Sequence, residues 1–138
     1  MKKIFVVDWC LVVAFPLAAI TGLWLHAAGH GGGHGRWHAS AVAHIVAALA
    51  FACLAVRHVV MHKGWVRRIG AAMRKGRLTL LLLAAFVFDC VTGTVLLFVA
   101  GGGAGVGLWH YAGGLLLVLL GAVHVAGRAG LLRKSVGR

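Results

Sequence analysis

The sequence is poor in cysteine, and its three cysteines follow no reactive or metal-binding spacing. Cys10, Cys53 and Cys90 stand far apart in apolar segments, so the C-x-x-C pair of a redox or zinc motif is missing. C-x-x-C-H is missing as well, which excludes a covalently attached c-type haem. We therefore expect the three thiols to be small apolar packing residues.

Long polar linkers are also missing. The chain has 138 residues, 62% of them hydrophobic, which is more apolar surface than a soluble core of this length could absorb. It contains apolar runs at about residues 4–25, 39–61, 78–100 and 108–130. Each run is near the ~20 residues that a bilayer-spanning helix needs. We predict one all-α domain over residues 1–138, an integral membrane four-helix up-and-down bundle.

The first run follows Lys2 and Lys3, as the apolar region of a signal peptide would. It is longer than a typical signal region, and Asp8 and Pro16 interrupt it. We therefore expect it to be a retained first helix.

Acidic residues are almost absent, since Asp8 and Asp89 stand against 14 lysines and arginines and leave a formal net charge of +12. In a four-span topology nearly all the basic residues fall on one side of the membrane, and Arg36 falls on the other. This positive-inside pattern predicts a multi-pass protein of the bacterial inner membrane with both termini in the cytoplasm. Attraction to the anionic bilayer surface, and not nucleic-acid binding, explains the basic excess. The basic side comprises Lys2, Lys3, Lys63, Arg67, Arg68, Arg74, Lys75, Arg77, Arg128, Arg133, Lys134 and Arg138.

Two histidine pairs with the same spacing dominate the pattern. His44 and His58 are fourteen residues apart in the second run, as are His110 and His124 in the fourth. Fourteen residues make four turns at about 3.5 residues per turn, so both histidines of a pair face the same way, ~21 Å apart. Two such helices side by side would present four imidazoles at two depths. This arrangement suits two bis-histidine haem b groups, whose six-coordinate irons pass electrons.

Other interpretations of these histidines stay open. The four imidazoles could instead bond to one another or to backbone carbonyls, although buried ionisable groups in membranes are costly and usually functional. His62 rivals His58 as the inner ligand, because it lies eighteen residues after His44. The fourth run favours His58, since its residue one turn beyond His124 is Arg128. We expect His62 and Arg128 near the inner haem edge or the lipid headgroups.

The charged residues within the apolar runs need partners. Asp8 and Arg57 are expected at a similar depth, so they would pair with each other or each find another partner. Arg57 could instead meet a propionate of the inner haem. Asp89 lies near the middle of the third run, where it would be protonated, bond to a neighbouring helix or belong to a proton path.

The segment between the first two runs is rich in histidine and glycine. His26, His30, His34 and His38 recur every four residues, but the glycines around them make a stable helix unfavourable. We predict a solvated loop, which either has no specific role or binds a metal or a partner.

The two halves of the chain also repeat a Thr-Gly pair, and the whole pattern resembles a known family. The sequence is similar to small four-helix di-haem b-type cytochromes, including flavinylation-associated cytochromes and the cytochrome b anchors of membrane dehydrogenases and hydrogenases. The resemblance implies that His44 and His110 bind the outer haem and that His58 and His124 bind the inner one. The residues that carry it are Thr21, Gly22, Trp37, His44, His58, Thr92, Gly93, His110 and His124.

The resemblance also implies a function. It predicts electron transfer between a quinone or cytoplasmic donor and a periplasmic or membrane redox partner, as a subunit of an oxidoreductase system more than as an enzyme alone. The alternative from the residues is a histidine-based metal-ion transporter or metal-binding membrane protein. That protein would capture ions with its outer histidines and use the intramembrane histidines and Asp89 as a path.

Overall fold

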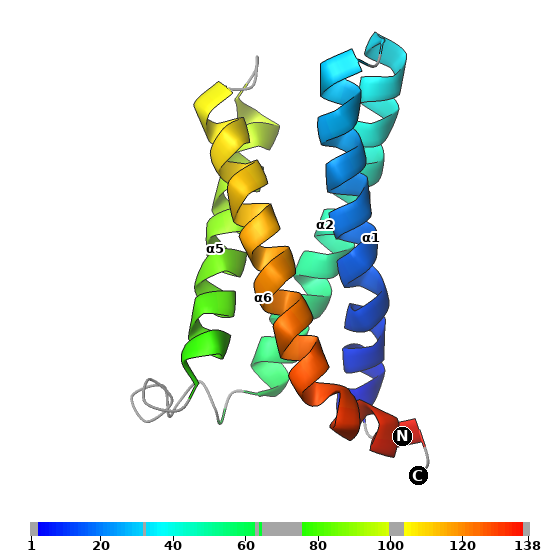
Figure 1. The fold of residues 1–138 in the computed structure, drawn as a ribbon, viewed down its shortest axis with the longest axis vertical. Coiled ribbons are helices and arrows are strands. Elements are labelled where there is room, and N and C mark those ends of the chain that lie inside the picture. The colour runs from blue at the N-terminus through cyan, green and yellow to red at the C-terminus, as the bar shows by residue number, and fades with distance from the viewer. Residues whose placement is uncertain (1–2, 32, 63, 65–75, 100–103, 137–138) are drawn as a thin grey trace. The chain divides into compact units, whose positions relative to one another are not determined.

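The computed structural model describes residues 3–31, 33–62, 64, 76–99 and 104–136, and these residues form four helices and no strand. Figure 1 shows them as α1 (Lys3–Gly31), α2 (His34–Met61), α5 (Arg77–Phe98) and α6 (Ala104–Val136). α1 continues through Pro16 without ending there. The predicted all-α class with four helices is confirmed.

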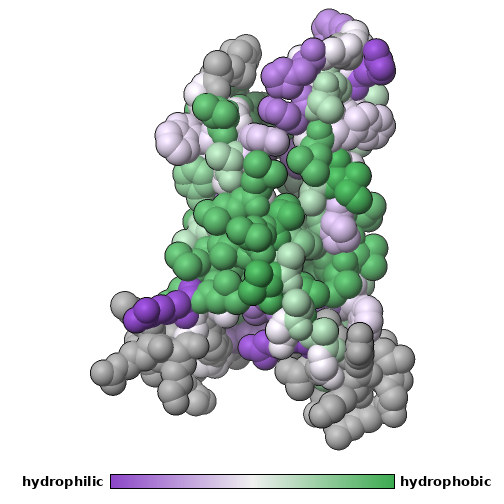
Figure 2. Space-filling model, in the orientation of Figure 1, coloured by the Kyte–Doolittle hydropathy of each residue, from purple (hydrophilic) through white to green (hydrophobic). Residues whose placement is uncertain are grey.

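All four helices are long and apolar enough to cross a bilayer, over Phe5–Gly31, His34–Met61, Arg77–Phe98 and Gly105–Gly130. Large apolar side chains such as Val13, Val46 and Leu119 are more than half exposed, as lipid-facing residues of a membrane protein are. Figure 2 shows hydrophobic residues over the middle of the helices and hydrophilic residues toward their ends. The chain therefore has the features of a multi-pass membrane protein.

The backbone contacts divide the chain into two units, Met1–Lys63 with Gly130–Arg138, and Gly64–Ala129. In the first unit α1 and α2 pack against each other as an antiparallel hairpin (Figure 1). In the second unit α5 contacts α6 through Thr92, which lies against His110, and through Asp89, which lies against Gly113. Each hairpin therefore holds one of the two predicted histidine pairs on its second helix.

The helices extend further than the sequence predicts at the histidine-rich segment. α1 continues to Gly31 and α2 begins at His34, so the predicted solvated loop is wrong for most of these residues. Glycine propensity is overridden because Ala28 and Ser40 are buried near these helix ends. The Ser40 hydroxyl donates to the carbonyl oxygens of Arg36 and Trp37, 2.9 Å from each, which completes polar contacts inside the helix.

Several basic residues behind the predicted topology lie outside the described residues. They are Lys2, Lys63, Arg67, Arg68, Arg74, Lys75 and Arg138. The predicted orientation of the termini therefore stays a prediction from the sequence.

Candidate functional site

His44 on α2 is held by a threonine of the neighbouring helix. The Thr21 hydroxyl lies 2.8 Å from the carbonyl oxygen of Leu17 and 3.1 Å from that of Ala18, so its single proton is directed into its own helix. Nδ1 of His44 lies 3.3 Å from Thr21 Oγ1. Because the hydroxyl proton is already used, the threonine oxygen can act only as an acceptor toward Nδ1. The His44 ring also has a hydrogen bond with the backbone of Ala18 on the same helix as Thr21.

The residue after Thr21 gives the imidazole its space. A Cβ atom on Gly22 would lie 3.0 Å from Cε1 and 3.3 Å from Nδ1 of His44. A side chain at this position would be in close contact with the ring, which would have to shift by a few tenths of an ångström. Thr21 therefore provides a hydrogen-bond acceptor for Nδ1 of His44, and Gly22 leaves the space that the ring occupies.

The second hairpin repeats this arrangement with different residues. The Thr92 hydroxyl donates to the carbonyl oxygen of Phe88 at 3.0 Å, and its oxygen lies 3.0 Å from Nδ1 of His110. A Cβ atom on Gly93 would lie 3.1 Å from Cε1 of His110. The two repeated Thr-Gly pairs therefore form two equivalent histidine-holding sites, which we call histidine seats. Thr21 and Gly22 form the seat of His44, and Thr92 and Gly93 form the seat of His110.

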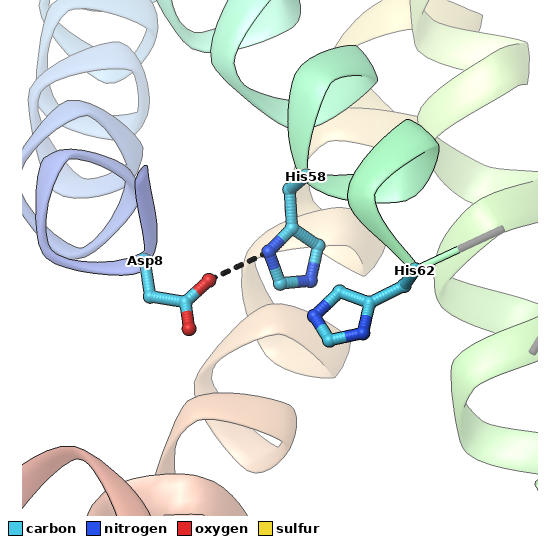
Figure 3. Close-up of side chains that lie close together, drawn as sticks. All are labelled: Asp8, His58 and His62. Carbon is cyan, nitrogen blue, oxygen red and sulfur yellow. Dashed lines mark hydrogen bonds and ion pairs between the residues drawn. The ribbon is translucent and has the colours of Figure 1, made fainter. Parts of the chain in front are cut away.

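His58, at the other end of α2, is held by a carboxylate instead of a hydroxyl. Its Nδ1 lies 2.7 Å from Oδ1 of Asp8 on α1, and both side chains are partly buried. Figure 3 shows the Asp8 carboxylate pointing at the His58 ring. A carboxylate accepts hydrogen bonds, so His58 donates its Nδ1 proton to Asp8.

These contacts decide which nitrogen of each ring can bind a metal. In His44, His58 and His110 it is Nδ1 that faces an oxygen of a neighbouring helix. A ring that keeps its proton on this nitrogen has its lone pair on Nε2 when it binds a metal. Metal-binding histidines ordinarily donate their second nitrogen to such a partner, which orients the ring and raises its basicity. The three donor sets therefore fit a haem iron, which takes neutral imidazoles as axial ligands.

The partner of Asp8 differs from the first expectation. Asp8 pairs with His58, so of the two predicted alternatives, the Arg57 pair or another partner, the structure gives the second. Arg57 is exposed on α2, and Arg128 is exposed on α6. The predicted contacts of these arginines with haem propionates or headgroups stay predictions.

His62 lies beside His58 at the end of α2. Their ring centroids are 4.6 Å apart, and His62 is exposed. One ligand atom each from Asp8, His58 and His62 lies within 4.8 Å of the others, close enough to share one metal ion (Figure 3). Asp8 and His58 are partly buried and His62 is exposed. Among the residues that the structure describes, these three form the one group of three side chains that could share a metal ion.

Asp89 occupies a buried place between α5 and α6. It is 8% exposed, and its Oδ1 has no hydrogen-bond partner in the described part of the chain. That oxygen lies 4.0 Å from Nδ1 of His110, which is too far for a hydrogen bond. Gly113 lies directly against the carboxylate and against the Phe88 ring, so this glycine is a helix-packing position.

An open apolar pocket lies next to the His110 seat. It has a volume of about 340 Å³ and is lined by Phe88, Thr92, Val106 and Trp109. This volume lies at the lower end of the range of small-molecule sites.

The remaining histidines have simpler surroundings. His26 and His30 lie one turn apart on α1, with ring centroids 4.7 Å apart, and both are exposed. The His34 ring meets Trp37 edge-on at 6.5 Å on α2. His124 lies partly exposed on α6, fourteen residues after His110 as the sequence states.

The sequence pointed to the histidines but not to what holds them. Thr21, Gly22, Thr92 and Gly93 entered only as a repeated pair, and Asp8 entered as a charge in need of a partner. The available signal was that a Thr-Gly pair precedes a histidine pair in each half, but the intervals from threonine to histidine, 23 and 18 residues, differ by more than one helical turn. Comparison of the chain with family models, curated proteins and solved structures finds no match.

Proposed function

We propose that the chain is a transmembrane electron-transfer protein that binds two haem b groups. His44 and His110 would hold the outer haem, and His58 and His124 the inner one, as their equal spacing suggests. Bound haem would supply one-electron chemistry, and ligation by two imidazoles would favour electron transfer over oxygen binding. The chain itself would hold three of these histidines through Thr21, Asp8 and Thr92.

One observation carries this proposal. Three of the four candidate ligands have Nδ1 bonded to an acceptor on the preceding helix: Thr21, Asp8 and Thr92 respectively. Packing alone would not require the same nitrogen to be engaged each time. An axial haem ligand does require it, because the iron needs the Nε2 lone pair.

The proposed setting is the bacterial inner membrane with both termini in the cytoplasm. The basic residues at the ends and in the middle segment support this orientation. A quinol or a cytoplasmic reductant would donate electrons at one side. A periplasmic or membrane redox partner that carries flavin, haem or iron would exchange them at the other.

Optical spectroscopy tests the proposal directly. The protein is purified from haem-supplied cells, and the reduced-minus-oxidised spectrum and the extracted haem are measured per chain. We expect b-type bands, non-covalent haem and two haems per chain. His58→Ala and His124→Ala should each lose the same single haem. A colourless protein would overturn the proposal, and loss of different haems would overturn the pairing.

Metal-ion binding or transport is the second candidate function, because Asp8, His58 and His62 can offer three ligand atoms to one ion. Nitrogen and carboxylate ligands of this kind suit Zn²⁺. Zinc binding at one equivalent by a colourless protein would favour this candidate. The same measurement on a haem-loaded protein should give no such binding, because His58 would already be used.

A further inference from the structure

The two histidines of the first hairpin are held by chemically different partners. His44 has only neutral partners among those identified on α1, the Thr21 hydroxyl at 3.3 Å and the Ala18 backbone, whereas His58 donates to the carboxylate of Asp8 at 2.7 Å. Both partners lie on α1 and both histidines on α2, so the difference runs along one pair of helices. Hydrogen bonds to a charged acceptor are shorter and stronger than those to a neutral one.

The second hairpin repeats the neutral type. His110 donates to the Thr92 hydroxyl at 3.0 Å, while the nearby Asp89 oxygen stands 4.0 Å from the same nitrogen. That separation is too long for a hydrogen bond, so the hydrogen bond of His110 Nδ1 is with Thr92 and not with Asp89. A threonine therefore holds the first histidine of each pair, His44 or His110. A carboxylate holds His58, the second histidine of the first pair.

A carboxylate on Nδ1 changes what the ring does to a metal. It draws the Nδ1 proton toward itself and makes the ring a stronger electron donor through Nε2. A stronger donor stabilises ferric over ferrous iron, which lowers the reduction potential, and axial ligands and their hydrogen bonds are the levers that set this potential. A threonine hydroxyl orients the ring with a much smaller effect.

We propose that Asp8 is a tuning residue that makes the haem level of His58 the low-potential one, so that electrons run from the Asp8 end of the first hairpin toward the Thr21 end. This inference rests on the proposed haem function. One electron enters at the His58 level from a quinol or a cytoplasmic reductant. The exchange would balance with one electron at each stage: haem held at the His58 level would supply the electron that haem held at the His44 level accepts, and an oxidised flavin, haem or iron centre of a partner would take up one electron in turn. No bond forms and no proton needs to cross between the two levels.

The structure explains why a carboxylate is found at this place. A charged group inside a bilayer is unfavourable unless it has a close partner, and Asp8 has one in His58. An asparagine could hold the ring through its amide oxygen without any charge. What the carboxylate adds is therefore electrostatic, and its removal should be visible in the potential more than in the folding.

Spectroelectrochemical titration of the haem-loaded protein tests the proposal. The wild type should show two one-electron waves, and His58→Ala should remove the lower one. Asp8→Asn keeps an acceptor for Nδ1 and removes the charge. It should raise the lower wave by about a tenfold change in the ferric-to-ferrous equilibrium, which is ~59 mV for one electron, and leave the upper wave in place.

Asp89→Asn is the matched control, because it removes the other carboxylate without touching a hydrogen bond to histidine. It should leave the lower wave in place, because the histidine that Asp89 faces is His110, at 4.0 Å, and not His58. The proposal is overturned if Asp8→Asn leaves both waves unchanged or moves the upper one, or if Asp89→Asn moves the lower wave equally. A protein that binds no haem would overturn the proposed function itself, which separates the two failures.

Discussion

Oγ1 of Thr92 lies 3.0 Å from Nδ1 of His110, in a helix pair that repeats the contact between Thr21 and His44. In both pairs the threonine hydroxyl gives its proton to its own helix, so its oxygen is left to accept. The following glycine removes the side chain that would collide with the ring. The two hairpins therefore hold His44 and His110 through the same ring nitrogen, each next to a threonine oxygen and a glycine.

Replacing the seat threonines by valine should weaken haem binding. Valine keeps the shape and the membrane-compatible surface of threonine but cannot accept the Nδ1 proton. We expect Thr21→Val or Thr92→Val to lower the affinity for the outer haem about tenfold or more, because partners of metal ligands typically contribute that much. Competition of the variants with a haem-binding apoprotein, followed by absorbance, measures the change.

Thr94→Val is the control for this prediction. The Thr94 hydroxyl donates to the carbonyl oxygen of Cys90 at 2.7 Å and is exposed, two residues from Thr92. Its loss should leave haem affinity unchanged. Equal loss of haem in all three variants would show that threonine matters for the helix and not for histidine.

Adding a methyl group at the seat glycine should displace the histidine ring. In Gly22→Ala the new Cβ would lie 3.0 Å from Cε1 of His44, closer than van der Waals contact allows. We expect lower haem content and a changed low-spin ferric signal in electron paramagnetic resonance, which reports ring orientation. Gly29→Ala on the same helix has no atom within 4 Å and should bind haem normally, with a helix up to about 1 kcal/mol more stable. Normal spectra of Gly22→Ala would contradict the seat.

The four helices could be predicted from the length and apolar composition of the runs, and the common face of each histidine pair from its spacing. Four apolar runs of membrane length and two fourteen-residue spacings can be read without any knowledge of contacts. The partner of Asp8 could not be read in this way. Arg57 and His58 are neighbours on α2, and the choice between them depends on which one the helix turns toward α1.

The extent of the helices at the histidine-rich end depends on packing in the same way. Glycine lowers helix propensity by about 1 kcal/mol per residue, which predicted a loop over the segment that holds His30 and His34. Burial of Ala28 and Ser40 lets α1 and α2 continue almost to each other. Propensity describes an isolated helix, whereas these two helices form with a neighbour in place.

Packing around Asp89 should make Gly113 sensitive to substitution. A Cβ atom at this position would meet the Asp89 carboxylate and two carbons of the Phe88 ring at 2.9 Å. We expect Gly113→Ala to destabilise the protein by about 1–3 kcal/mol, because inserting an atom into a close helix contact forces side chains or backbone to shift. Thermal unfolding in detergent, followed by circular dichroism, measures the loss.

Gly127→Ala provides the comparison on the same helix, because nothing lies within 4 Å of its added Cβ. It should unfold at the wild-type temperature or slightly above, since alanine favours the helix. If both variants lose the same stability, the effect belongs to glycine in α6 generally and not to the contact with Asp89.

His62 separates the two candidate functions. It belongs to the group of ligand atoms shared with Asp8 and His58, but it has no place among the proposed haem ligands. If the protein carries haem, His62→Ala should keep both haems and the wild-type absorbance spectrum. If the protein binds a metal ion instead, the same change should weaken zinc binding by one to two orders of magnitude, because one of three ligands is lost.

His38→Ala, which changes an exposed histidine at the other end of α2, is the control for both measurements. A variant that loses one haem and retains zinc would give His62 the role assigned to His58.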